Sequence, residues 1–489
     1  MARWIGVLVL FLMATSGCSS EGPEQPRPEA ADDTSRFLNV SGDVAYVGDE
    51  ACVSCHEELY QRYQTHGMAQ SFAPVTPDNV PGGFAEAERY HAETDFYYRL
   101  IEEEGRFYQE EYRLGPSGEK THRLVRQMQY ATGSGKAGYT YFTEQNGRYY
   151  QLPLSWYVHP STWDFNPGYA ENNQRFSRVL NNRCAFCHNS YPEPVAFSRR
   201  KYRSILRPIG CERCHGPGQR HVEERLADPE MAGNIDYSIV NPAHLPLDRQ
   251  LDVCQQCHLN GTVALLREGR ESFDFRPAEA LASHVSLFNV VEPETGLIGV
   301  VSHADRMQQS ACFRRTRSQN RPLNCLTCHD PHEGFRDKGP AYFNATCQAC
   351  HAPEALQARL AATAQATHTA SADCSSCHMP KVGADVDPHT SFTDHWIRVV
   401  VEKTPEATID PREGPIELKP HFARDAEGRE GTLYEALAYM SYGRSHGDLD
   451  AIERGARTAQ KTLKSHPTFG EAHLLLGQSL LLLAQVEDA

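Results

Sequence analysis

Cysteine and histidine recur at one fixed spacing along this chain of 489 residues. Fourteen of the sixteen cysteines fall into seven Cys-x-x-Cys-His units. A shuffled chain of the same composition would hold roughly 0.03 such units, so the pattern is not accidental. The units are Cys52/Cys55/His56, Cys184/Cys187/His188, Cys211/Cys214/His215, Cys254/Cys257/His258, Cys325/Cys328/His329, Cys347/Cys350/His351 and Cys374/Cys377/His378.

Three kinds of chemistry use a Cys-x-x-Cys pair. Structural zinc would combine the pairs two by two, or add a histidine several residues away, and does not require histidine directly after the second cysteine. A disulfide framework gives no reason for that histidine either. Covalent c-type haem does, because two thiols form thioethers to the porphyrin and the adjacent imidazole ligates the iron. The pattern therefore predicts seven covalently attached c-type haems.

The second axial ligand of each iron must come from elsewhere in the chain. Sixteen histidines remain outside the units, whereas only six methionines follow the N-terminal apolar run. Methionine could not serve all seven irons, so mostly bis-histidine haems of low potential are expected. For each candidate, a core or surface histidine is the alternative. The candidates are His66, His221, His303, His332, His368, His389 and His395, with His284 as a further member of the pool.

The spacing of the units indicates a densely packed haem core. Their first cysteines are separated by 132, 27, 43, 71, 22 and 27 residues. The short gaps leave room for about one short helix and a loop, so neighbouring porphyrins should lie close together. The sequence predicts a mainly α and irregular multihaem cytochrome c core, with a first haem segment at 46–87 and a six-haem core at 171–400.

The 132-residue gap has a different composition. The stretch 88–170 holds no cysteine but twelve of the twenty-two tyrosines. Aromatic-rich runs broken by turn residues such as Asn146-Gly147 predict antiparallel strands, and hence a β-rich insert. We expect its aromatic side chains on a sheet face that packs on the haem core, with a binding surface as the alternative.

The C-terminal part changes character again. Helical patterns cover Leu433 to Gly443, Leu449 to Leu463 and Phe469 to Leu483. Two Gly-containing pairs 34 residues apart resemble the tetratricopeptide repeat, so 429–489 is predicted as repeat-like helices after a linker at 401–428. About one and a half repeats cannot stand alone, so the helices dock on the cytochrome body or the chain is incomplete. They would form either a partner-binding groove or a structural cap.

The N-terminus has the features of an export signal. In residues 1–17, Arg3 precedes the apolar run Trp4 to Met13, which is about half as long as the roughly twenty residues a membrane span needs. Cys18 follows Ser16-Gly17 and resembles a bacterial lipobox cysteine; ordinary cleavage after Ser16 is the alternative. Residues 18–45 would then be a lipid-anchored flexible linker, because they are rich in Pro, Glu, Asp and Ser.

Localisation and partners follow from these features. The protein is expected on the periplasmic side or at the cell surface, anchored to the outer membrane through Cys18. The net charge of −15, from 48 basic and 63 acidic residues, gives no footprint for a phosphate backbone, so nucleic acid is not an expected partner. The expected partners are redox proteins, either other cytochromes or a quinol-linked donor, and a protein bound at the C-terminal helices.

Four segments of the chain carry a family resemblance. They resemble bacterial exported multihaem c-type cytochromes that end in tetratricopeptide repeats, and are similar to the tetrahaem cytochromes that accept electrons from hydroxylamine oxidation and to doubled Cys-x-x-Cys-His proteins. The resemblance implies electron transfer through closely spaced haems, with distal ligands at His66, His221, His332 and His395. The segments are 51–56 with 66–69, 210–218 with His221, 325–332, and 377–380 with 394–396.

Two functions remain open from the sequence. The first is an electron carrier with every iron six-coordinate. The second is a multihaem oxidoreductase that acts on a small nitrogen or sulfur compound at one open-coordination haem. Ample histidine and the absence of any Cys-x-x-Cys-Lys unit, which marks the catalytic haem of pentahaem nitrite reductases, favour the carrier. Cys312, outside the units, is either a thiolate ligand or redox centre, or a small buried hydrophobic residue.

Overall fold

The computed structural model describes most of the chain between residues 36 and 487. Predictions made for 1–35, including the lipidated Cys18, for 401–415 and for His368 lie outside the described residues. Within them, every helix is too short or too polar to cross a bilayer. The described residues are 36–196, 198, 200–203, 206–230, 233–259, 261–290, 302–319, 321–335, 338–356, 373–384, 387–399 and 416–487.

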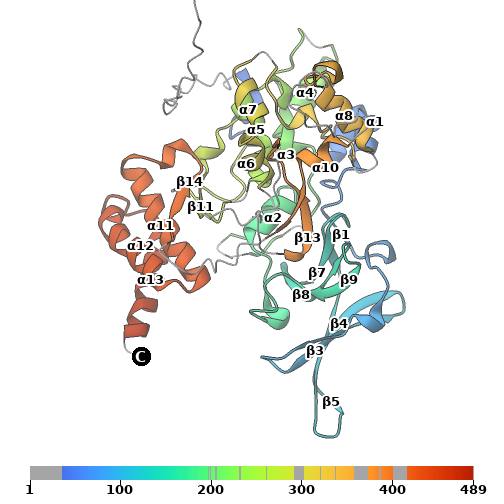
Figure 1. The fold of residues 1–489 in the computed structure, drawn as a ribbon, viewed down its shortest axis with the longest axis vertical. Coiled ribbons are helices and arrows are strands. Elements are labelled where there is room, and N and C mark those ends of the chain that lie inside the picture. Colours follow the sequence, from blue (N-terminus) through green and yellow to red (C-terminus); the bar gives the residue numbers. More distant parts are fainter. Residues whose placement is uncertain are drawn as a thin grey trace, which may run out of the picture.

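The predicted β-rich insert consists of two antiparallel sheets, which lie at the lower right of the molecule in Figure 1. The first sheet has the order β2-β3-β4-β5 and the second β1-β6-β7-β8-β9. Because β1 pairs with β6, the second sheet begins inside the segment expected to carry only the first haem. The strands are β1 Phe72–Pro74, β2 Arg89–His91, β3 Phe96–Glu103, β4 Arg106–Leu114, β5 Lys120–Gln127, β6 Tyr130–Thr132, β7 Gly138–Gln145, β8 Arg148–Tyr157 and β9 Thr162–Phe165.

The aromatic residues of the insert pack mainly against one another. Tyr98, Tyr141 and Trp163 are buried in one hydrophobic cluster to which both sheets contribute. The Gln109 side chain joins the sheets, because its amide donates to the Leu154 carbonyl and accepts from the Leu154 N–H, both at 2.8 Å. A second cluster carries Phe72 and Tyr149 onto the helix of unit 184–188. Most of the aromatic side chains therefore form the insert's own core, and a smaller group contacts the core expected to hold haem.

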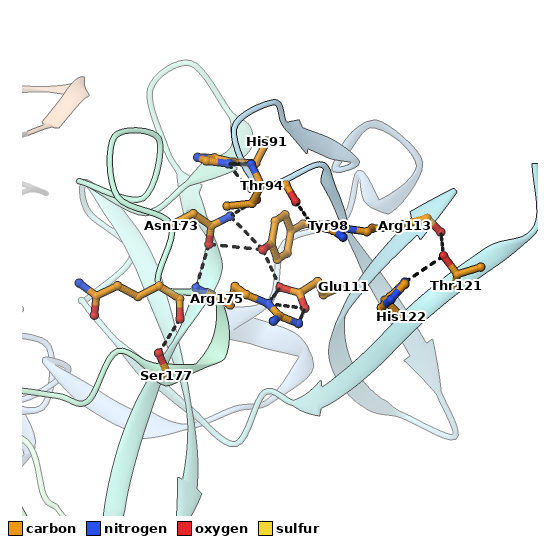
Figure 2. Close-up of polar contacts among 11 residues, drawn as sticks. His91, Thr94, Tyr98, Glu111, Arg113, Thr121, His122, Asn173, Arg175 and Ser177 are labelled. Carbon is orange, nitrogen blue, oxygen red and sulfur yellow. Dashed lines mark hydrogen bonds and ion pairs between the residues drawn. The ribbon is translucent and has the colours of Figure 1, made fainter. Parts of the chain in front are cut away.

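Two adjacent buried glutamates of β4 organise the first sheet. Glu111 accepts a 2.6 Å hydrogen bond from the Tyr98 hydroxyl and an ion pair from Arg175, which lies in the loop after β9 (Figure 2). Glu110, fully buried, is bonded to Arg123, Arg99 and Lys120. Burial would raise the pKa of Glu110, but these three cationic partners lower it to about 2, so the carboxylate stays charged in the folded protein.

Replacing Glu110 by Gln should lower the free energy of unfolding by about 2 kcal/mol at pH 7, because the charged hydrogen bonds are lost while the partners remain partly in solvent. The folded-state pKa lies below the ordinary value of 4.5, so this stabilisation is present above pH 4.5 and lost as the pH falls towards 2. Thermal unfolding followed by circular dichroism at pH 7 and pH 3 measures both effects. The exposed Glu104→Gln is the control, and equal pH dependence in wild type and Glu110→Gln would contradict the assignment.

Short helices carry most of the Cys-x-x-Cys-His units. In a helix the two cysteines, three residues apart, share one face, and the histidine follows on the next turn position. Unit 325–329 instead begins with a 3-10 turn at Cys325–Thr327. The helices of this region are α1 Asp49–Tyr63, α2 Asn182–His188, α3 Glu212–His215, α4 Gln219–Ala227, α5 Leu247–His258, α6 His303–Gln308, α7 Ala311–Thr316, α8 Pro340–Gln348 and α10 Cys374–His378.

The region 171–400 is less purely helical than predicted. It also contains β10 Val263–Leu266, β11 Val285–Val290 and the hairpin β12 Lys381–Ala384 with β13 Asp387–Thr393. Strand β14, Leu418–Pro420, lies in the expected linker and pairs with β11, which pairs with β10. The fold is therefore mixed, because short aliphatic runs that carry no unit form edge-to-edge pairs between the helices.

The C-terminal helices dock on the cytochrome-like body, at the left of Figure 1. Val263 and Phe288 of the small sheet pack in one cluster with the helices. Arg267, after β10, is buried and forms ion pairs with Asp425 at 2.7 Å and Glu430 at 3.0 Å. The three predicted helices are present as α11 Gly428–His446, α12 Leu449–Thr462 and α13 Gly470–Glu487. Docking is thus the arrangement seen, while their tetratricopeptide character stays a prediction.

Candidate functional site

The histidine of unit 52–56 faces a predicted distal ligand. The ring centres of His56, on α1, and His221, on α4, lie 6.3 Å apart with 17° between the ring planes. In a bis-histidine haem, an iron–nitrogen bond of about 2 Å on each side and about 1.1 Å from nitrogen to ring centre put the two centres about 6 Å apart. The pair therefore fits two imidazoles on opposite faces of one iron.

Three further units show the same separation. The ring centres of His215 and His332 lie 6.0 Å apart, those of His329 and His395 6.3 Å, and those of His258 and His303 5.9 Å. The interplanar angles vary from 17° to 82°, which axial ligation permits because each ring turns freely about its bond to iron. Each pair joins a unit histidine to a histidine predicted as distal ligand, although the ligation itself stays a prediction.

Hydrogen bonds at Nδ1 fix the tautomer of several of these rings. Nδ1 of His215 lies 2.8 Å from the Val240 carbonyl, and Nδ1 of His395 lies 2.9 Å from the Thr393 carbonyl. A carbonyl oxygen only accepts, so both rings carry their proton on Nδ1 and leave the lone pair of Nε2 for a metal. Nδ1 of His221 is similarly placed 3.1 Å from an Asp236 carboxylate oxygen. The donor set therefore suits iron ligation through Nε2.

Burial keeps other imidazoles of this region neutral. Desolvation lowers the pKa of His188 to about 4 and that of His329 to about 4. Desolvation, reinforced by His395 and His258, lowers the pKa of His303 to about 3, and the buried Nδ1 of His303 has no hydrogen-bond partner. Neutral imidazole is the form that binds metal, so these rings are held ready as ligands at neutral pH.

Several side chains of the units lie at the protein surface, which corrects the expectation of a uniformly dense core. Their helices pack on the body along a narrow side only, and Tyr63 is the one buried residue of α1 and α10 taken together. The turn that carries the second cysteine therefore faces outward. The exposed unit residues are Cys55, His56, Cys184, Cys350, His351 and Cys377.

Surface exposure leaves the haem-attachment role of these residues a prediction. A thioether needs a thiol that the porphyrin can reach, so exposure of Cys55, Cys350 and Cys377 is compatible with attachment without demonstrating it. The exposed imidazole of His351 belongs to none of the four facing pairs, and neither do those of His188 and His378. The second ligands of these three units therefore stay unassigned.

Two predicted distal ligands are engaged differently. Nδ1 of His66 accepts the Met68 N–H at 3.0 Å, which leaves the proton of the neutral ring on Nε2. Nε2 of His389 lies 2.9 Å from an Asp164 carboxylate oxygen, so this histidine connects β13 to β9 of the insert. His284 of the wider pool has Nδ1 near Ser283 and Nε2 3.3 Å from Glu279. In this conformation these rings are held by protein groups, and their ligand roles stay predictions.

Charged side chains that the sequence analysis did not single out position the facing pairs. Glu212, inside unit 211–215, accepts the N–H groups of Val47 at 2.9 Å and Gly48 at 2.8 Å, directly before α1. It therefore holds the helix of His56 beside the helix pair of His215 and His221. A charged dipeptide between two haem-attaching cysteines was the available signal, because attachment places those residues in the interior.

Asp394 does the same for His395. This carboxylate is fully buried and accepts hydrogen bonds from Arg306 at 2.6 Å and Arg398 at 2.8 Å. Burial would raise the pKa of Asp394, but the Arg306 hydrogen bond and the two guanidinium charges lower it. Because Arg306 lies on α6, which begins at His303, the carboxylate ties the His303 helix to the His395 loop; these two rings are themselves 4.7 Å apart.

Units that are distant in sequence are neighbours in space. Thiol–thiol hydrogen bonds connect Cys52 with Cys211, Cys187 with Cys257, Cys254 with Cys325, and Cys347 with Cys374. Electrostatic contact also joins Cys328 to Cys347. The contacts give a continuous series of the units 52–56, 211–215, 254–258, 325–329, 347–351 and 374–378, closed between its second and third members by a contact of Cys214 with Cys257, with unit 184–188 beside unit 254–258.

No self-sufficient metal cluster accompanies these pairs in the described part of the chain. There, no group of three or more His, Cys, Asp or Glu side chains is arranged to hold a metal ion. Iron in a bis-histidine haem takes only two protein ligands. Cys312, on α7, lies within electrostatic reach of Cys328 and Cys347, so the cysteine outside the units is placed beside two of them; its role as a ligand stays a hypothesis.

Comparison with known proteins agrees with this chemistry. Residues 163–216 match the model of the family described as cytochrome c554 and c-prime, and this span contains units 184–188 and 211–215. The match supports a multihaem c-type cytochrome with covalently bound haem. The chain is also similar to the solved structure of the outer cell wall cytochrome OcwA, at 16% identity and a TM-score of 0.45, covering 90% of this chain and 99% of that chain. No curated protein matches the chain.

Replacing His221 by Ala should convert the haem at His56 from six-coordinate low-spin to high-spin iron, because its sixth ligand is removed. Electron paramagnetic resonance of the oxidised protein measures the change, which should involve about one haem in seven. The control is His389→Gln, since Nε2 of His389 is bonded to Asp164. A wholly low-spin His221→Ala spectrum would show that another residue is the ligand.

Proposed function

We propose that this protein is a c-type cytochrome that carries electrons through seven covalently bound, mostly bis-histidine haems. The observation that supports this most is the set of four imidazole pairs with ring centres 5.9 to 6.3 Å apart, each including the histidine of a Cys-x-x-Cys-His unit. Two imidazoles saturate an iron, leaving no position for a substrate. Such an iron changes only its oxidation state, and this is the chemistry of an electron carrier.

The contacts between units supply the route. Each thiol becomes a thioether at the edge of its porphyrin, so a contact between thiols of two units brings two porphyrin edges together. The described contacts would let an electron pass from unit 52–56 through unit 211–215 to unit 254–258, and onward through unit 325–329 towards unit 374–378. Unit 184–188 joins at unit 254–258 as a branch.

The two ends of this series are the places where electrons would enter and leave. Unit 52–56 begins the series and exposes Cys55, whereas unit 374–378 ends it and exposes Cys377. A haem attached to an exposed thioether presents an edge to the surface, where a partner protein can approach it. The interior units 211–215 and 254–258 have both cysteines at least partly covered, as suits intermediate carriers.

The proposed setting is an exported, membrane-anchored respiratory chain. Bis-histidine ligation favours low potentials, which suit anaerobic-type respiration. Residues 1–17 would direct export and Cys18 would carry the lipid anchor. The net charge of −15 favours redox partners that present a basic docking surface, because complementary charge raises the rate of encounter. Other cytochromes or a quinol-linked protein would fill this role.

Three measurements on the purified mature protein test the proposal. The pyridine haemochrome and the intact mass should both give seven haems per chain. The oxidised spectrum should be low-spin, and nitrite, hydroxylamine or sulfite should leave it unchanged, because no coordination position is open. A high-spin component that shifts with one of these compounds would favour the multihaem oxidoreductase instead, and a colourless protein with the mass of the bare peptide would refute both.

A further inference from the structure

Arg213 lies where three of the units meet. It is one of the two residues between Cys211 and Cys214, and its side chain is only 1% exposed. Nη2 donates a 2.9 Å hydrogen bond to the Phe186 carbonyl of unit 184–188 and lies 3.8 Å from Sγ of Cys257. The Arg213 carbonyl accepts a 2.9 Å hydrogen bond from Nε2 of Gln256, inside unit 254–258. One residue thus contacts units 184–188 and 254–258 from within unit 211–215.

The surroundings of this guanidinium are aromatic. It lies 4.1 Å from the ring centre of Phe186 and 4.8 Å from that of Tyr191, and Tyr191 stacks on Tyr46 at 3.8 Å. Among the ion pairs of the described residues, none involves Arg213, and its buried Nε and Nη1 have no hydrogen-bond partner. Arg267 is the opposite case, a buried arginine whose charge is paired with Asp425 and Glu430.

A buried charge of this kind acts on its neighbours. Arginine stays protonated in proteins, so Arg213 is a permanent positive charge. Cation–π contacts with the two rings hold it in place without neutralising it. Charges interact more strongly in the protein interior than in water. A positive charge therefore favours the reduced state of a nearby iron, because reduction removes one positive charge from the centre that it repels.

We propose that Arg213 is a potential-tuning residue, a fixed positive charge that raises the reduction potentials of the haems on units 184–188 and 254–258. The proposal rests on the proposed function, since it requires haem on those units. Its consequence is that electrons in the series are drawn to the junction between these two units. Unit 184–188 then serves as a store of electrons beside the main route.

The test is the replacement of Arg213 by Met, which keeps the length of the side chain and removes its charge. Spectroelectrochemical titration of the holoprotein should show about two of the seven haems shifted to lower midpoint potential, with the haem content by pyridine haemochrome unchanged. Arg213→Lys, which retains the charge, should restore the wild-type titration. Arg267→Met removes a buried arginine whose charge is neutralised by protein carboxylates, and should lower the melting temperature without shifting any potential.

Unchanged potentials in a fully loaded Arg213→Met protein would overturn the proposal. An equal shift in Arg213→Lys would also overturn it, because the effect would then come from packing. Should Arg213→Met fail to fold, Arg213→Gln carries the same test, since its amide still provides a donor for the Phe186 carbonyl. Absence of haem from the wild-type protein would refute the proposed function, which is a distinguishable result.

Discussion

An iron atom with two axial imidazoles draws its ligands from two separate places in the chain. The unit histidine comes with the porphyrin attachment site, whereas the facing histidine is 165 residues away for His56 and His221 and 117 for His215 and His332. The fold of this protein is largely the set of connections that hold such distant segments opposite one another. Glu212 and Asp394, both buried carboxylates bonded to N–H groups or guanidinium groups, act at two of these connections.

The peripheral parts are attached to this centre by polar groups as well as by apolar packing. The insert has its own aromatic core, and the bond between His389 and Asp164 joins it to the hairpin that leads to His395. The C-terminal helices are fastened through Arg267 and Asp425 to the loop after β10. Each attachment pairs a buried or half-buried charge with its partner, and removing one partner would leave the other charge without compensation.

The sequence was most informative where covalent chemistry sets the spacing. The seven units, the aromatic strands of the insert and the three C-terminal helices follow from local patterns that the structure retains. Which histidine faces which unit does not follow, because it depends on contacts across more than a hundred residues. Strand β14 was expected to be linker, since three residues of strand carry no period and gain their pairing only from β11. Arg213 was overlooked because a charged residue inside a unit gives no sign of being buried.

The contacts between cysteines of different units bear on how the protein is made. Cys52 and Cys211 share a hydrogen bond although 159 residues separate them. In an oxidising compartment two thiols so close are an oxidant away from a disulfide, and such a bridge would block both porphyrin attachment sites. Thioether formation removes the hazard permanently. Maturation therefore has a required order, in which the cofactors are joined to an extended chain and tertiary collapse comes afterwards.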